Sequence, residues 1–476
     1  MQLLIPLSKG EPLFRQVYAG LRQAILSGTF RAGDRVPSTR DLADQLGISR
    51  TVVVLAYELL LAEGFVAGRS GSGTYVPAGL ATARARGSGK PSELRLSRFG
   101  ASAAAMASRV QFPSPRVTPL PYDFAYGRSD VECFPFEPWR RILRRRARQA
   151  RIRELDYGPS AGSEALREAI CAHLRRSRAV ACEPSQMIVV NGSQQALDLI
   201  ARVLIEAGDG VVIEDPGYQG TREILRAARA RLHAVAVDRD GLDPTLLPAH
   251  ARVAFVTPSH QFPTGAVLPL ARRQALLHWA KRRNAVIVED DYDGELRYQG
   301  KPLESLQGLD TEGRVIYVGT FSRTIFSALR IGYLIVPKSL LPAFTAAKWL
   351  CDRHTATLEQ ETLADFIRTG MYERHLRRLR RRNAASRHAL LEALQKHIGD
   401  RVEVTGADAG AHVVLWPRKR ISEDAVVAAA ASRGVGVYGV NGYFLRPPSR
   451  PGILLGYSRM REAEIREGVR RLAGTL

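Results

Sequence analysis

Apolar residues recur at helical spacing through the first 63 positions of the chain. The segment 13–26 (LFRQVYAGLRQAIL) carries apolar side chains three or four positions apart, which predicts an amphipathic helix. Ser38 is a natural N-cap for a second, short helix, with Asp41 three residues later near its positive end. Ser49 would cap a third helix over residues 50–63.

The second and third predicted helices are separated only by residues 47–49 (GIS), which predicts a helix-turn-helix. The helix that begins at Arg50 would then enter the DNA major groove by its N-terminal end. Short β-type runs at 65–66 and 74–76 flank a glycine-containing stretch, residues 67–73, which predicts a hairpin. Such a hairpin would be a wing beside the recognition helix.

The segment PLFRQVYAGLRQAILSGTFRAGDRVPSTRDLADQLGISRTVVVLAYELLLAEGFVAGRSGSGTYV resembles a GntR-type winged helix. The resemblance implies a DNA-binding domain over residues 1–77 and double-stranded operator DNA as its partner. Arginines suit guanine edges and phosphates, and hydroxyls with helix N-terminal N–H groups suit phosphates. A helical protein-interaction module is the alternative. The resemblance implies seven DNA-contacting residues: Arg40, Ser49, Arg50, Thr51, Arg69, Gly71 and Gly73.

The amino-acid composition changes over residues 78–121. The stretch ATARARGSGKPSE is rich in Ala, Gly, Ser and Arg, and four prolines follow between 113 and 121. This composition predicts a basic flexible linker, with a possible short helix over residues 96–108 that starts the next domain. The linker could follow DNA phosphates or simply be solvated.

From Tyr122 onward, short β-type runs alternate with helical patterns, which predicts an α/β domain over residues 122–476. A mostly parallel sheet flanked by helices is expected, then a smaller C-terminal α+β subdomain from about Pro337. The expected strands are 187–190, 210–213, 253–256 and 285–288, and the clearest helices are 194–206 and 270–283.

Polar motifs follow several of these strands, where open α/β sheets bind ligands. NGSQQA at 191–196 would offer helix N-terminal N–H groups to an anion, and DPGY at 215–218 places an aromatic ring suited to stacking. EDDYD at 289–293 offers a carboxylate for a protonated pyridine nitrogen. GTFSRTIFSALRIGY at 319–333 offers hydroxyl and guanidinium groups for a phosphate.

These motifs, with TPSHQFPTG at 257–265, resemble fold-type I aminotransferases, and specifically the MocR/PdxR regulators that join a GntR-type winged helix to that fold. The resemblance implies pyridoxal 5′-phosphate as the cofactor and a homodimer in which Tyr157 reaches the phosphate of the partner subunit. It implies no metal ligands. Arg450 or Arg459 could bind an effector carboxylate, and Phe262 stands where the enzymes commonly have Asn. The implied cofactor-binding residues are Tyr157, Ser193, Gln194, Tyr218, Asp290, Tyr292, Ser322, Arg323 and Arg330.

Arg323 stands where the family has the cofactor lysine. A guanidinium stays protonated and is a poor nucleophile, so it cannot bond covalently to the cofactor aldehyde as a lysine amine does. We therefore expect no catalytic residue and no transaminase activity. The cofactor could bind non-covalently, the pocket could take another anion, or the lysine could have been replaced artificially.

The net charge of +22 suggests a polyanionic partner. It includes two arginine-rich runs, 140–153 and 374–382, which are either solvated helix faces or additional phosphate contacts. Four cysteines without a C-x-x-C pair, no apolar span and no signal sequence predict a cytoplasmic protein. The expected function is a transcriptional regulator that senses an amine, amino acid or vitamer; an aminotransferase with an added DNA-binding module and a ligand-independent architectural binder are the alternatives.

Overall fold

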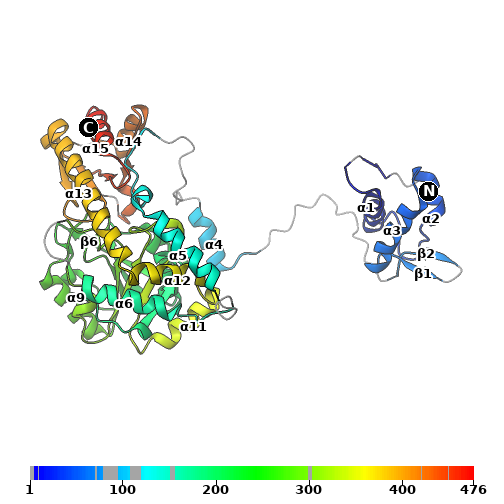
Figure 1. The fold of residues 1–476 in the computed structure, drawn as a ribbon, viewed down its shortest axis with the longest axis horizontal. Helices are drawn as coiled ribbons and strands as arrows, with labels where there is room; N and C mark the ends of the chain where they lie inside the picture. Colours follow the sequence, from blue (N-terminus) through cyan, green and yellow to red (C-terminus); the bar gives the residue numbers. More distant parts are fainter. Residues whose placement is uncertain are drawn as a thin grey trace. The chain divides into compact units, whose positions relative to one another are not determined.

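The computed structural model describes residues 5–8, 10–69, 72–78, 95–107, 120–150, 156–298, 303–419, 421–446, 448 and 450–476. The chain divides into two compact units, Met1–Arg95 and Leu96–Leu476 (Figure 1). The second unit includes α4 (Arg98–Ala107), which lies within the segment 78–121 and agrees with the possible short helix expected over residues 96–108 at the start of the next domain. The linker boundaries stay a prediction, since residues 79–94 and 108–119 lie outside the described part of the chain.

The first unit is a three-helix module with a two-stranded hairpin. Its elements are α1 (Leu13–Leu26), α2 (Thr39–Leu46), α3 (Arg50–Ala62), β1 (Ala67–Arg69) and β2 (Gly73–Tyr75). Ser38 caps α2 by accepting a hydrogen bond from the Asp41 N–H, as predicted. The hairpin begins at Ala67, as predicted. The N–H groups of Phe65 and Val66 both donate to the Leu60 carbonyl and complete the end of α3.

The second unit is built on an eight-stranded sheet with the order β4-β11-β10-β9-β8-β5-β6-β7. Strands β10, β9, β8, β5 and β6 run parallel, whereas β11 and β7 are antiparallel to their neighbours. The strand bounds are Met187–Val190 (β4), Gly210–Asp215 (β5), Arg231–Asp238 (β6), Gly241–Leu242 (β7), Ala251–Val256 (β8), Val286–Asp291 (β9), Val315–Thr320 (β10) and Gly332–Ile335 (β11). The predicted, mostly parallel sheet is confirmed.

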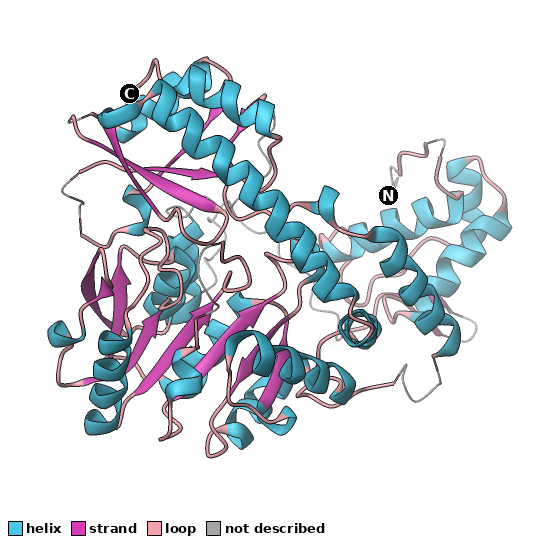
Figure 2. Cartoon of the chain, turned by 60° about the vertical axis from the view of Figure 1, so that its left-hand side comes forward, coloured by secondary structure: helices cyan, strands magenta, loops and turns pink. Residues whose placement is uncertain are grey.

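Helices cover both faces of this sheet (Figure 2). Alternate residues of one strand point to opposite faces, so Val211 and Ile213 pack in the same cluster as residues of α7, whereas Val212 packs in the cluster that contains residues of α9. The helices around the sheet are α5 (Phe136–Gln149), α6 (Glu164–Arg178), α7 (Ser193–Leu204), α8 (Gln219–Ala227), α9 (Leu270–Arg283), α10 (Leu306–Leu309), α11 (Leu341–Asp352) and α12 (Thr357–Arg368).

A smaller α+β subdomain closes the chain, as predicted. The antiparallel sheet β12-β13-β16-β15 packs against α13, α14 and α15, while β3 from the start of the unit pairs with β14. That pairing brings the residues after β3 to the subdomain, and Phe124 is buried in its core. The bounds are Tyr122–Asp123 (β3), Met371–His397 (α13), Val402–Thr405 (β12), His412–Pro417 (β13), Glu423–Ser432 (α14), Val435–Gly436 (β14), Tyr438–Gly439 (β15), Ile453–Gly456 (β16) and Glu462–Leu472 (α15). Among the described residues, no helix is long and apolar enough to cross a membrane.

Candidate functional site

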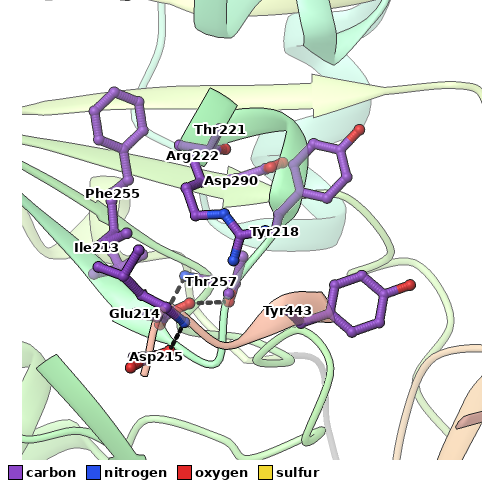
Figure 3. A pocket seen from close by; sticks show the side chains of 13 residues that line it. Ile213, Glu214, Asp215, Tyr218, Thr221, Arg222, Phe255, Thr257, Asp290 and Tyr443 are labelled. Atoms are coloured by element: carbon purple, nitrogen blue, oxygen red, sulfur yellow. Dashed lines mark hydrogen bonds between the residues drawn. The ribbon is translucent and has the colours of Figure 1, made fainter. Parts of the chain in front are cut away.

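A pocket lies where the parallel strands end. Its walls come from the end of β5 (Glu214 and Asp215), the start of α8 (Tyr218), the end of β9 (Asp290) and a loop of the C-terminal subdomain (Tyr443), as Figure 3 shows. These segments are far apart in the sequence, and the parallel arrangement of β5, β8 and β9 brings them to one edge of the sheet.

Asp290 has a free acceptor in this pocket. Its Oδ1 atom is buried and accepts no hydrogen bond from the described part of the chain. Burial, and then the charge of Asp291, raises the pKa of the Asp290 carboxyl to about 7, and Arg323 opposes that rise. A buried acceptor without a donor is costly, and a protonated ring nitrogen would supply the missing donor.

Tyr292 belongs to a buried hydrogen-bonded group. Its hydroxyl oxygen lies 3.0 Å from Nδ1 of His260, and the same nitrogen lies 2.8 Å from Oδ2 of Asp293. Burial raises the pKa of Tyr292 well above its ordinary value, so the hydroxyl keeps its proton. Sequence reasoning gave Asp293 no role, although it is a further carboxylate of the EDDYD motif.

The N-terminus of α7 and Arg330 form a compact basic corner. Gly192, the N-cap of α7, has φ 85°, and a Cβ atom there would lie 2.8 Å from Nη2 of Arg330. Nη2 of Arg330 donates to the Asn191 carbonyl at 2.8 Å. Ser193 begins the helix, so its N–H and the Arg330 side chain are available to one anion.

Two other predicted phosphate ligands have partners within the chain. The Ser322 N–H and hydroxyl both contact Oγ1 of Thr320 at the end of β10. The side-chain oxygen of Gln194 accepts a hydrogen bond from the Tyr218 hydroxyl at 3.2 Å. Gln194 therefore also positions the predicted stacking ring.

Tyr157 lies on the surface and is 72% exposed. The Arg353 guanidinium carbon lies 4.1 Å from the centre of its ring. This exposure leaves the Tyr157 hydroxyl available to a second subunit, which stays a prediction.

Arg323 points into an aromatic environment. Its guanidinium carbon lies 4.8 Å from the centre of the Tyr126 ring, and a Cβ atom on Gly127 would be 3.0 Å from Nη1. Arg323 forms no ion pair with any residue that the structure describes. Sequence reasoning missed Tyr126, because it belongs to no strand-end motif and reaches the site only through the β3–β14 pairing.

Phe262, in the position where the enzymes commonly have Asn, is buried among aromatic rings. Its ring centre lies 5.1 Å from that of Tyr126 and 4.9 Å from that of Tyr443. The apolar ring cannot donate the hydrogen bond of an amide, so this side of the pocket is aromatic instead. Tyr443 also carried no sequence signal, since it comes from a three-residue 3-10 helix, Asn441–Tyr443, of the subdomain.

The two predicted effector arginines differ in their surroundings. Arg450 forms a 2.8 Å ion pair with Glu403 and lies over the Trp416 ring, so its charge already has a partner. Arg459 is exposed and follows Ser458, which lines a second pocket together with Arg323.

The predicted DNA-contacting residues of the first unit lie at the starts of two helices and in the hairpin. Arg40 in α2 and Ser49, Arg50 and Thr51 at the start of α3 are all exposed. Nε of Arg50 lies 3.4 Å from Oγ1 of Thr39, which ties the start of α3 to the start of α2. These four exposed side chains offer hydroxyl and guanidinium donors from adjoining helix starts.

In the hairpin, Arg69 lies over the Tyr75 ring at 4.9 Å and Gly73 has φ 113°. A Cβ atom on Gly73 would be 2.7 Å from Nε of Arg35, a basic neighbour that sequence reasoning missed. Gly71 lies outside the described residues. Arg69 of the hairpin and the neighbouring Arg35 thus place two arginines near its turn.

Some arginines of the two arginine-rich runs form ion pairs within the protein. Arg145 and Arg146 of α5 both bind Asp365 of α12, and Arg382 of α13 binds Asp130 at 2.7 Å. The remaining exposed arginines of these helices leave both interpretations of the runs open.

Comparisons with known proteins agree with the division of the chain into two units. Residues 13–76 match the family model "Bacterial regulatory proteins, gntR family", and residues 130–472 match "Aminotransferase class I and II". The probable rhizopine catabolism regulatory protein MocR of Rhizobium meliloti is 39% identical over 97% of this chain and 93% of its own length. The pyridoxine biosynthesis transcriptional regulator PdxR of Corynebacterium glutamicum is 32% identical over 98% of this chain and 96% of its own.

Among solved structures, LysN, an alpha-aminoadipate aminotransferase from Thermus thermophilus, is similar with a TM-score of 0.71 and 29% identity. The match covers 78% of this chain and 96% of LysN, which was crystallised with N-(5′-phosphopyridoxyl)-L-leucine. The predicted fold-type I architecture is confirmed.

Proposed function

Because the chain belongs to the MocR/PdxR subfamily of GntR-type transcriptional regulators, we propose that its first unit binds operator DNA and its second unit binds a small-molecule effector. Binding of the effector would change operator affinity only if the ligand prefers one arrangement of the protein over another. The first unit would then recognise DNA and the second unit would bind the effector, within one chain.

The first unit would read duplex DNA through the start of α3. Arg50 and Thr51 are exposed there, and Arg69 extends from the hairpin. Helix N-terminal groups and hydroxyls contact phosphates, whereas arginine can contact guanine in the major groove. These residue roles rest on position, exposure and the family.

The second unit would hold pyridoxal 5′-phosphate without a covalent bond. Asp290 offers its unpartnered oxygen to the ring nitrogen, and Tyr218 offers its ring for stacking. The start of α7 and Arg330 would take the phosphate. The bound cofactor would supply an electron-withdrawing ring; this chain's residues would bind and orient it.

Transaminase activity is not part of this proposal. Both regulators described above carry names of regulatory proteins, and LysN shares the fold as an enzyme. Arg323 supports the regulatory class, because it cannot provide the neutral amine that carries the cofactor and moves protons in an aminotransferase.

The protein would form a homodimer through the surface around α11. On α11, Trp349 and Leu350 are 51% and 77% exposed, and Tyr157 contacts the neighbouring Arg353. Large apolar side chains gathered on a surface mark protein–protein contacts. Two winged helices per dimer would bind paired half-sites in operator DNA.

The observation that carries the ligand-binding proposal is the buried, unpartnered Oδ1 of Asp290 beside Tyr218. Titration of the full-length protein with pyridoxamine 5′-phosphate, followed by calorimetry, tests it. We expect saturable binding that Asp290→Ala weakens at least about tenfold, which is the loss of one charge-assisted hydrogen bond. Operator affinity measured with and without saturating ligand tests the coupling; no binding, or an identical affinity in both states, would contradict the corresponding step.

A further inference from the structure

A groove lined by arginines lies between α13 and the start of α5, and we call it the arginine groove. Its volume is about 470 Å³, and it shares no lining residue with the cofactor pocket. None of the described residues that line it is acidic. The lining residues are Pro135 and Pro138 of the α5 start and Met371, Arg374, His375, Arg377, Arg378 and Arg381 of α13.

The four arginines form one stripe along α13. Positions 374, 377, 378 and 381 have the spacing that places side chains on one face of a helix, and all four residues are exposed. Arg378 donates a hydrogen bond to the Cys133 carbonyl, which ties α13 to the short helix η1 (Val131–Cys133). Arg374, Arg377 and Arg381 form no ion pair with any residue that the structure describes.

The positive charge of this stripe is not balanced from within α13. Glu373 stands four positions before Arg377, but its carboxylate lies 3.5 Å from Nδ1 of His173. The positions three and four before Arg381 are themselves arginines. Like charges at these spacings repel each other, so an anion from outside the chain would stabilise the stripe.

The arginines of α15 show how a helix face that meets only water is arranged in this protein. Arg470 and Arg471 both pair with Glu467 at 2.7 Å, and Arg466 lies 3.5 Å from Glu462. Each of these arginines thus has a glutamate three or four positions before it, which is the favourable spacing on a helix. The arginine groove lacks this pattern, and that difference favours a binding surface.

We propose that the arginine groove binds phosphates of duplex DNA, so that the second unit adds its own contacts to DNA binding. The inference rests on the proposed operator binding, because DNA held by the first unit is at a high local concentration for the second unit of the same chain. Guanidinium groups bind phosphate oxygens with pairs of hydrogen bonds. The rise from Arg374 to Arg381 is about 10 Å, at about 1.5 Å per residue. Successive phosphates of one strand rise about 3.4 Å along the duplex, so the stripe is long enough for at least two of them.

The salt dependence of DNA binding tests the groove without knowledge of the operator, because phosphate contacts carry no sequence information. The probe is a fluorescein-labelled duplex of arbitrary sequence and about 40 base pairs, titrated with the full-length protein and followed by anisotropy. The double variant Arg377→Gln/Arg381→Gln should lower the slope of log affinity against log salt by about 0.9 for each lost phosphate contact, hence by about 1.8 for each bound chain. Between about 50 and about 200 mM salt, the affinity of the unmodified protein should fall about tenfold further than that of the variant.

The double variant Arg466→Gln/Arg470→Gln is the matched control. These two arginines of α15 are also exposed and four positions apart, so the control removes the same charge from a helix whose arginines have glutamate partners. Its slope should equal that of the unmodified protein. The melting temperature of the α13 variant should not fall, because the substitutions relieve repulsion between like charges; lost DNA binding is then not lost folding.

Each remaining outcome overturns the inference. If the unmodified protein binds the duplex and the α13 variant has the same slope, the run 374–382 is a solvated helix face, and the proposed DNA binding by the first unit stands. If both double variants lose the same slope, only net charge matters. If the unmodified protein binds no duplex even at about 50 mM salt, the proposed DNA binding itself fails.

Discussion

The guanidinium carbon of Arg323 lies 4.8 Å from the centre of the Tyr126 ring. The contact has the geometry of a cation–π interaction, and it places a permanent charge where the resemblance to aminotransferases predicts a titratable amine. The aromatic ring helps to accommodate that charge, since no acidic residue in the described part of the chain forms an ion pair with it.

Arg323→Lys should restore a covalent attachment point. A buried lysine can lose its proton and attack the cofactor aldehyde, whereas the guanidinium cannot. After incubation with pyridoxal 5′-phosphate and borohydride, intact-mass analysis should show one stable adduct per chain in the variant and none in the unmodified protein at the same cofactor ratio. Arg459→Lys, which adds an exposed lysine outside the pocket, should behave like the unmodified protein; an equal adduct in it would show that labelling is unspecific.

Asp290→Asn should change the pH dependence of stability. The pKa of Asp290 is raised from 3.8 to about 7, so the folded state holds a proton that the unfolded state releases. The contribution of this proton to the free energy of unfolding is complete below pH about 4 and is lost as the pH rises through 7. The asparagine variant should therefore gain stability relative to the unmodified protein between these values, by at most about 4 kcal/mol.

Calorimetric melting of both proteins at pH 4.5 and pH 8 measures the effect. The variant should melt higher only at pH 8, while its affinity for pyridoxamine 5′-phosphate falls. Asp240→Asn, which removes a carboxylate exposed on the surface, is the control. A difference in melting temperature that does not depend on pH would mean that Asp290 is ionised throughout.

Gly192→Ala should damage the predicted phosphate site more than the fold. Gly192 has φ 85°, so alanine costs about 1 kcal/mol of backbone strain. Its Cβ would also approach Nη2 of Arg330 to 2.8 Å and displace that guanidinium. Gly208→Ala is a matched control, since Gly208 has φ 97° and open space at the Cβ position. Both variants should lose similar stability, and only Gly192→Ala should lose affinity for pyridoxamine 5′-phosphate; equal affinities would contradict the site.

The sequence predicted the elements whose signals are local. The segment 13–26, the cap at Ser38 and the run 270–283 follow from short-range patterns, and the structure has them where they were expected. Tyr218 and Asp290, each near the end of a strand, line one pocket because parallel strands bring their ends together, and their role as cofactor ligands stays a prediction. The sequence could not predict Tyr126 or Tyr443, which arrive through pairing and packing of distant segments.

Arg50→Ala should weaken operator binding and reduce its dependence on salt. Arg50 is exposed at the start of α3, and loss of a base contact there costs about 1–3 kcal/mol. If Arg50 instead neutralises one phosphate, the slope of log affinity against log salt falls by about 0.9. Fluorescence anisotropy with labelled operator at salt concentrations from about 50 to about 200 mM distinguishes these cases. Arg15→Ala, an exposed arginine on α1, should change neither quantity.

Leu350→Glu should convert a dimer into a monomer. Leu350 is 77% exposed on α11 beside the half-exposed Trp349, and a glutamate placed in a subunit interface would have to be buried without a partner, at a cost of several kcal/mol. Light scattering coupled to size exclusion should show half the mass of the unmodified protein. Leu246→Glu, at another exposed leucine that is distant in the sequence from Leu350, should leave the mass unchanged. If Leu350→Glu and the unmodified protein have the same mass, α11 is not the interface, and Tyr157 cannot serve a partner's phosphate through that surface.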